Sequence, residues 1–214
     1  LLSTTRPPTR TPGGNLKPGE YMPEALCDIR FADDIMRLEH TGRFGSPAEV
    51  RAQLHNPTLS LFIAAGFYVA HTSFLRDVQY DPLLPYIFMG EEIMMSARAY
   101  TSGWDVYAPS VDVIKHMYVR QESPKFWETV NDVYGDGGMH NDLTDLILDR
   151  IKYNLDWKGK RRQQDLKMPR LVNRLDKYGI GGKRKLRDFY ALAGIDMERQ
   201  TTRTQQWCVR GERH

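Results

Sequence analysis

The sequence has little cysteine, no long hydrophobic run and no leader at its start. Only Cys27 and Cys208 occur in 214 residues, too few for a disulfide scaffold or a zinc knuckle, although they are compatible with a single bridge. The longest apolar run, residues 59–70, contains Ser60 and Gly66 and is much shorter than the roughly 20 residues that cross a bilayer. The opening LLSTTRPPTRTPGG lacks the basic start and apolar centre of a signal peptide. We therefore expect no membrane span, and the missing initial Met suggests a chain cut from a longer protein.

The composition is that of a globular protein. Hydrophobic residues make up 41% and charged residues 27%, enough to form a core, so disorder of the whole chain is excluded. The length favours one domain with an appendage. The net charge of +3 is uneven, because residues 158–187 contain twelve Lys or Arg against two Asp. This basic stretch either faces phosphates or anionic lipid, or is an ordinary solvated helical face.

The amino-terminal half reads as alternating strands and helices. Residues 1–22 have loop composition and predict an extended surface segment. The run LSLFIAAGFYVAH, residues 59–71, predicts a buried strand that bends at Gly66 and forms the centre of a sheet. Apolar residues at helical spacing then predict a helix from Glu91 to about Ser102, ended by Gly103 in a left-handed conformation. WDVYAP and VDVIKHMYV predict two short strands.

The carboxyl-terminal half is predicted to be helical. Ser123 and Pro124 are expected to open one helix, and Asn141 to cap another. A basic linker follows, and two short helices are expected near residues 170–177 and 184–193, before a frayed polar tail. The glycine-rich stretches YGDGG and YGIGGKRK lack the Lys-Ser/Thr ending of a phosphate loop and are interpreted as turns.

Adjacent carboxylates and a nearby histidine form the main chemical candidate. Glu91 and Glu92 open the predicted helix, and His116 projects from a following strand. The pair could act in catalysis, or it could only stabilise the first helical turn, where the helix dipole favours negative charge. His116 is either a functional residue or a hydrogen-bonded structural one.

Two further residues are candidates for binding. Arg120 follows His116 by four residues and so shares its strand face, where a guanidinium could clamp diphosphate oxygens; Lys115 points the other way. The alternative is an ordinary surface Arg at a strand end. Trp104 could stack on an acceptor or a sugar, or could simply belong to the core.

Nearly the whole chain resembles a known family. The stretch GFYVAHTSFLRDVQYDPLLPYIFMGEEIMMSARAYTSGWDVYAPSVDVIKHMYVR, with LLST at the start and YGIGGKRKLRDFYALAGID near the end, resembles the protein-hydroxyproline N-acetylglucosaminyltransferases. The resemblance implies a GT-A fold, a Rossmann-like αβα sandwich. It also implies a UDP-sugar donor, a divalent cation and retention at the anomeric carbon. Residues 1–120 would then be the carboxyl-terminal part of the catalytic domain, and residues 121–214 a helical, partly basic extension.

The resemblance assigns roles to individual residues. It implies that His116 completes a cation site, for which imidazole and carboxylate ligands suit Mn²⁺, with Mg²⁺ as the alternative. Glu91 and Glu92 match an acidic pair under the sugar and the acceptor, where a retaining reaction favours orientation of the donor and charge stabilisation. Which of the two is catalytic stays open. Gly66 and Phe67 match a turn that approaches the donor, or form only a bend in a core strand.

The resemblance also predicts what the chain needs. No DxD or Asp-x-His triplet precedes Leu59, so we expect an upstream metal-binding half and no transferase activity from this chain alone. The expected activity is transfer of N-acetylglucosamine from UDP-GlcNAc to a hydroxyproline-like hydroxyl of a protein. The alternatives are a non-catalytic protein-binding module or pseudoenzyme, and an enzyme that uses a different sugar. No nucleic-acid partner is expected, and the location is expected to be cytoplasmic, or the Golgi if the parent protein carries an anchor.

Overall fold

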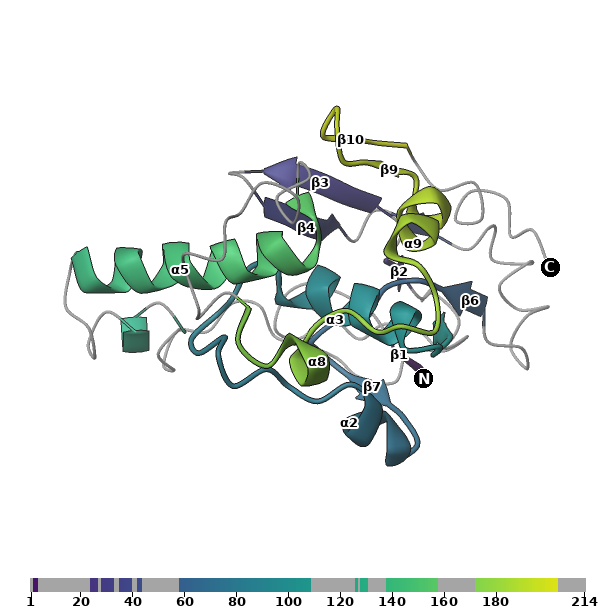
Figure 1. Ribbon diagram of the computed structural model, residues 1–214. Coiled ribbons are helices and arrows are strands. Elements are labelled where there is room, and N and C mark those ends of the chain that lie inside the picture. Colours follow the sequence, from purple (N-terminus) through teal and green to yellow (C-terminus); the bar gives the residue numbers. More distant parts are fainter. Residues whose placement is uncertain are drawn as a thin grey trace, which may run out of the picture.

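A central helix surrounded by helices and small sheets organises the protein. The computed structural model describes residues 2–3, 24–26, 28–32, 35–39, 42–43, 58–108, 126, 128–130, 138–157 and 172–203. Helix α3 (Glu91–Thr101) lies in the middle of these segments (Figure 1). The described part is therefore mixed α/β, which confirms the predicted class at that level.

The largest sheet has four short strands in the order β6, β8, β1, β7. They are β6 (Thr58–Ser60), β8 (Val106–Ala108), β1 (Leu2–Ser3) and β7 (Tyr68–Val69). β1 runs parallel to β8 and antiparallel to β7, and β6 runs antiparallel to β8. The prediction of a strand in WDVYAP is confirmed, whereas the loop prediction for residues 1–22 is wrong at β1. A two-residue strand carries no periodic signal, and its two neighbours alone select its conformation.

The remaining strands of the described residues form three two-stranded sheets. They are β2 (Glu24–Ala25) with β5 (Gly42–Arg43), β3 (Asp28–Ala32) with β4 (Ile35–Glu39), and β9 (Ile195–Asp196) with β10 (Thr201–Thr202). The Thr202 hydroxyl donates to the carbonyl of Ile29 at 2.8 Å, which fixes the last hairpin to β3. The polar tail was expected to fray after the last helix, but its start forms this hairpin because a distant strand supplies a partner.

The apolar run 59–71 is buried as predicted only at residues 60–64; Leu59 and Val69 are exposed, and the run is not one continuous strand. β6 and β7 occupy its ends, and residues 61–64 between them are buried; no strand of the described residues pairs with them. Side chains bind the backbone amides instead. The amide of Ile63 donates to the Ser96 hydroxyl at 2.9 Å, and the amide of Ala65 to the Glu92 carboxylate at 2.8 Å. Backbone amides need a hydrogen-bond partner when they are buried. Here side chains of α3 take the place of the neighbouring strand that the sheet prediction implied.

Helix α3 matches its prediction at both ends. It covers Glu91–Thr101, and Gly103 has a φ of +84°, the left-handed conformation expected for a residue that ends a helix. The glycine loop after α8 packs on this end: the Gly181 amide donates to the Thr101 hydroxyl at 2.9 Å. The amide of Lys183 donates to the Thr101 carbonyl, also at 2.9 Å. YGIGGKRK is thus a structural loop, in agreement with its interpretation as a turn.

The described part of the chain also contains helices α2 (Ser73–Asp77), α5 (Gly138–Asn154), α8 (Leu175–Tyr178) and α9 (Leu186–Ala193). α9 confirms the prediction near residues 184–193, and α8 begins later than expected. α5 begins at Gly138, so the predicted cap at Asn141 is wrong. The apolar spacing from Leu143 onward located the helix but not its first turn, which begins at Gly138. The predicted strand VDVIKHMYV, residues 111–119, and the basic linker lie outside the described residues.

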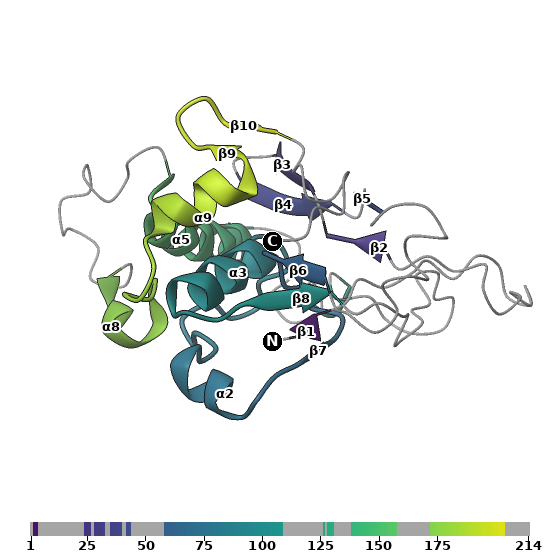
Figure 2. The same ribbon diagram turned by 90° about the vertical axis from the view of Figure 1, so that its right-hand side faces the viewer.

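One hydrophobic core joins most of these elements. α5 and α9 pack beside α3, with the β3–β4 hairpin across them (Figure 2). Buried core residues come from every one of these elements: Ile29, Ile35, Met36, Phe62, Ile93, Ala97, Ile147, Ile151, Leu155 and Phe189. The predicted boundary at residue 120 lies outside the described residues. None of the described helices is long and apolar enough to cross a membrane.

Candidate active site

A pocket of about 150 Å³ opens beside the first turns of α3. Its walls come from three places: the end of the apolar run, the proline-rich segment that precedes α3, and α3 itself. The lining residues are Ile63, Ala65, Tyr68, Tyr80, Asp81, Leu84, Ile87, Glu91, Glu92, Met94, Met95 and Arg98. The pocket therefore combines apolar walls with three carboxylates and one guanidinium, the mixture typical of sites for small polar ligands.

Glu91 is the half-buried acid of this pocket. Burial raises the pKa of its carboxyl from the ordinary 4.5 to about 7, and the neighbouring charge of Glu92 adds to the rise. Its own backbone amide lowers the pKa, as does any helix amino terminus, but a dipole contribution of roughly 0.3–1 kcal/mol is smaller than the cost of desolvating a carboxylate. Glu91 therefore exchanges a proton near neutral pH, a property that concentrates at functional sites.

Glu92 has a different environment although it is the next residue. Its carboxylate accepts the Ala65 amide at 2.8 Å, and its backbone carbonyl accepts the Ser96 hydroxyl at 2.7 Å. The structure thus brings both predicted glutamates to one pocket. Of the two carboxylates, that of Glu92 accepts the hydrogen bond from Ala65.

A buried ion pair supports the part of the pocket wall that the proline-rich segment forms. The Arg150 Nε donates to the Asp81 carboxylate at 2.7 Å, and both side chains are at most 2% exposed. Asp81 also accepts the Leu83 amide at 2.9 Å, so its carboxylate holds the bend of the proline-rich segment. Arg98, from α3, is buried beside this pair, and its Nε donates to the Gly179 carbonyl at 3.2 Å.

Arg98 keeps its positive charge in the pocket wall. Burial lowers the pKa of its guanidinium to about 10, and the nearby Asp81 carboxylate opposes that change. At neutral pH the pocket therefore holds a fixed cation near one end, while Glu91 lies two helical turns away on α3.

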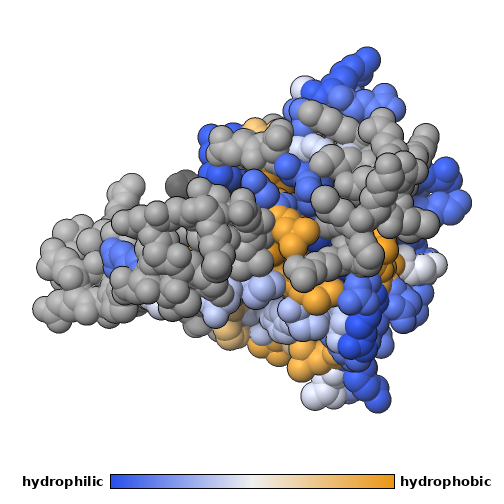
Figure 3. All heavy atoms as spheres, turned by 60° about the vertical axis from the view of Figure 1, so that its left-hand side comes forward, coloured by the Kyte–Doolittle hydropathy of each residue, from blue (hydrophilic) through white to orange (hydrophobic). Residues whose placement is uncertain are grey.

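Two tyrosines close one side of the pocket. The hydroxyl groups of Tyr68 and Tyr80 form a 2.6 Å hydrogen bond. Burial raises the pKa of Tyr68 to about 12, so its hydroxyl stays protonated. Tyr80 lines the pocket and is 63% exposed. Apolar patches also reach the surface of the molecule between hydrophilic areas (Figure 3).

The remaining predicted residues lie elsewhere. Gly66 belongs to the turn that follows Ala65, and neither Gly66 nor Phe67 is among the residues that line the pocket. Trp104 packs edge-on against Phe74, and its indole donates to Asp77 at 3.1 Å. These contacts place Trp104 in a smaller apolar cluster. The donor and acceptor roles of the three residues stay predictions.

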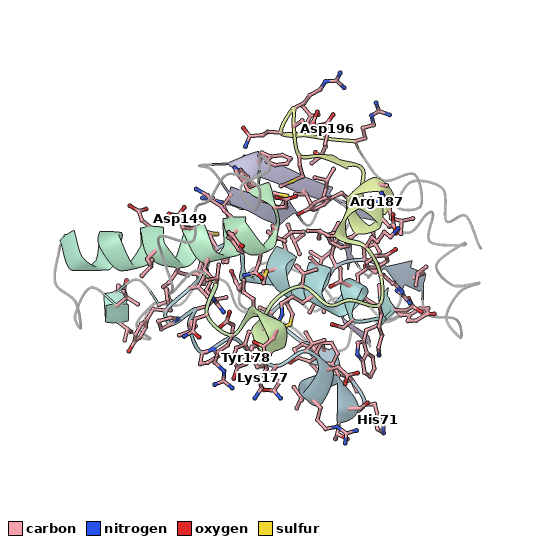
Figure 4. All side chains as sticks on the ribbon, viewed as in Figure 1. His71, Asp149, Lys177, Tyr178, Arg187 and Asp196 are labelled. Atoms are coloured by element: carbon pink, nitrogen blue, oxygen red, sulfur yellow. The ribbon has the colours of Figure 1, made fainter. Side chains whose placement is uncertain are left out.

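The predicted metal ligand and the residue predicted to bind the diphosphate are not among the described residues. His116, Arg120 and Lys115 lie outside the described residues. Within the described part of the chain, no three His, Cys, Asp or Glu side chains gather where they could hold a metal ion. His71 hydrogen-bonds Ser73 at 2.8 Å beside α2, at the edge of the molecule (Figure 4). The described residues therefore do not by themselves form a cation site.

The described part of the basic stretch faces solvent. Lys177 lies over the ring of Tyr178 at 5.4 Å on α8, and Arg187 lies on α9 (Figure 4). Arg184 pairs with Asp105 at 2.7 Å. Among the described Lys and Arg residues, only Arg98 lines the pocket, which favours the solvated-surface interpretation for these positions.

Sequence reasoning missed four polar residues of the site: Tyr68, Tyr80, Asp81 and Arg98. Arg98 lies seven residues after Glu91, about two helical turns along the same face of the predicted helix. Helical spacing could therefore have indicated it. Asp81 had no such signal, because its partner Arg150 is sixty-nine residues away.

Comparison with known proteins gives one clear result. A family model described as Glycosyltransferase (GlcNAc) matches residues 4–199, which is most of the chain. Searches of curated proteins and of solved structures found no match. The match includes every residue that lines the pocket.

Proposed function

The chain belongs to the GlcNAc glycosyltransferase family, and on this premise we propose that it transfers N-acetylglucosamine from UDP-GlcNAc to a protein hydroxyl. The family match is the observation that carries the proposal. A hydroxyproline-like acceptor, the GT-A fold and retention at the anomeric carbon are parts of the proposal that rest on the sequence resemblance. The mixed α/β structure is consistent with a glycosyltransferase domain.

The pocket supports a role in holding a sugar. Glu91 offers carboxylate oxygens that can accept hydrogen bonds from sugar hydroxyls, and the exposed ring of Tyr80 offers an apolar face to the opposite side of a sugar ring. In a transition state with oxocarbenium character, an ionised Glu91 held in a partly dry pocket would stabilise the developing positive charge. Asp81 does not fit this role because the buried Arg150 already engages its carboxylate.

A divalent cation, Mn²⁺ or Mg²⁺, is part of the same proposal. His116 is the residue that we propose to contribute to its site, since imidazole is a good Mn²⁺ ligand. When bound, the cation would offset negative charge on the UDP leaving group. The roles of the described residues do not depend on it: Glu91 binds and titrates, Arg98 stays charged, and the Asp81–Arg150 pair holds the wall.

A transfer assay tests the proposal. Radiolabelled UDP-GlcNAc and Mn²⁺ are mixed with peptides that contain hydroxyproline, and with matched proline peptides. The assay uses the chain and the longest reading frame that contains it. We expect label in the hydroxyproline peptides only, and a fall of about 100-fold or more in Glu91→Gln.

Matched controls decide between the outcomes. Glu198→Gln removes an exposed carboxylate near β9 and should transfer at the parental rate. Absence of transfer and of UDP release, both from the chain and from the longest reading frame that contains it, would refute the activity. Faster use of another sugar nucleotide would refute the donor, and labelling of the proline peptides would refute the acceptor.

A further inference from the structure

Two side chains of α3 hold the backbone of the pocket wall. The Ala65 amide donates to the Glu92 carboxylate at 2.8 Å, and the Ile63 amide donates to the Ser96 hydroxyl at 2.9 Å. The Ser96 hydroxyl uses its own proton to bond the Glu92 carbonyl at 2.7 Å. Two alternate amides of one extended segment are therefore fixed to one helix.

The spacing on the helix explains this arrangement. Glu92 and Ser96 are four residues apart and share a face of α3, whereas Glu91 is rotated from Glu92 by about 100°. The face with Glu92 and Ser96 meets the segment that contains Ile63 and Ala65. Glu91 lines the same pocket but has no hydrogen bond to that segment.

The held segment forms part of the pocket itself. Ile63 and Ala65 both line it, and Ala65 begins the turn that leads through Gly66 to the pocket residue Tyr68. No neighbouring strand supplies partners to residues 61–65 in the described part of the chain. The two hydrogen bonds from α3 therefore help to hold this wall in place.

We propose that Glu92 and Ser96 are positioning residues that set the wall of the pocket, and that Glu91 alone of the acidic pair acts on the substrate. The statement about substrate rests on the proposed function; the statement about the wall does not. The hydrogen bond to Ala65 needs an acceptor oxygen at Glu92 but no negative charge, whereas charge stabilisation by Glu91 needs the ionised carboxylate.

Two substitutions at position 92 separate these requirements. Glu92→Gln keeps an oxygen that can accept the Ala65 amide, and Glu92→Ala removes it. Hydrogen exchange at the Ala65 amide, followed by NMR, reads the bond directly and needs no activity. We expect exchange to accelerate about tenfold in Glu92→Ala, as for the loss of one hydrogen bond, and to return close to the parental rate in Glu92→Gln.

Ser96→Ala is the companion variant. It should accelerate exchange at the Ile63 amide by a similar factor while the Ala65 amide changes less. Glu91→Gln is the matched control for charge, since it removes a carboxylate from the same helical turn and should leave exchange at Ala65 unaltered. Unaltered exchange at Ala65 in Glu92→Ala would overturn the proposal.

Transfer rates then test the division of roles. Relative to the parental protein, Glu92→Ala should raise the KM for the donor more than it lowers kcat, and Glu92→Gln should recover most of the loss. Glu91→Gln should lower kcat without recovery. If Glu92→Gln retains the Ala65 bond yet loses transfer about as severely as Glu91→Gln, Glu92 acts through its charge and the proposal is wrong. If no protein transfers sugar, the proposed function fails while the exchange data still decide the role of the wall.

Discussion

Glu91 should reduce the stability of the fold at neutral and higher pH, and replacing it with Gln should reverse this. Its pKa is raised from 4.5 to about 7, chiefly by burial. In the unfolded chain the carboxyl ionises at its ordinary value. Between these two values the folded protein binds the extra proton, so the free energy of unfolding falls as pH rises from about 4.5 to 7 and stays low above that.

The size of the effect follows from the same two values. At about 1.4 kcal/mol per pH unit, the difference between 4.5 and about 7 corresponds to an upper bound of roughly 3.5 kcal/mol. Glu91 is only partly buried, and local water offsets some of the cost, so we expect Glu91→Gln to gain about 1–2 kcal/mol at pH 8. Near pH 4, where both states are protonated, the gain should vanish.

Urea unfolding at pH 4 and at pH 8 measures this directly. The parental protein, Glu91→Gln and the exposed control Glu198→Gln are compared at each pH, and the free energies of unfolding are extrapolated to water. The control should show no comparable pH-dependent gain. A Glu91→Gln variant that is no more stable at pH 8 than at pH 4, relative to the parental protein, would refute the claim that Glu91 is held in a desolvating site.

Three other predictions follow from the structure. Asp81→Asn takes the negative charge away from the buried Arg150 and should lower the free energy of unfolding by about 3–5 kcal/mol in urea titrations. Gly181→Ala would place a methyl carbon 2.6 Å from backbone atoms at the end of α3 and should cost about 1–3 kcal/mol, whereas Gly182→Ala, with open space around it, should be nearly neutral in thermal unfolding. If ionised Glu91 is the active form, the transfer rate should rise with pH up to about 7 and then level off, and Glu91→Gln should be slow and lack this rise.

The sequence was a good guide where local pattern decides the structure. α3 has apolar residues at helical spacing and a glycine at its end, and both of its boundaries match the prediction. Local sequence pattern also predicted the helix α9 and the strand β8. Burial of residues 61–64 was also foreseeable from composition, although their hydrogen-bonding partners were not.

The errors occur where distant residues decide the structure. β1 is a strand because β7 and β8 lie on either side of it, and the hairpin of β9 and β10 is fixed through a bond to Ile29, 173 residues away from Thr202. A local window cannot contain such partners. The same limit applies to the site, because the bond between Asp81 and Arg150 also joins remote positions.

The acidic pair shows how adjacent residues acquire different roles. Sequence alone gives Glu91 and Glu92 the same helix end and the same favourable dipole, so neither can be chosen. Successive residues of a helix are rotated by about 100° around its axis, so the Glu92 carboxylate reaches the Ala65 amide in the folded protein. The Glu91 carboxylate lines the pocket and is desolvated by burial. Burial there outweighs the dipole and raises the pKa of Glu91 toward neutrality. The surrounding walls, rather than the helix that carries both residues, therefore determine which carboxylate exchanges a proton near neutral pH.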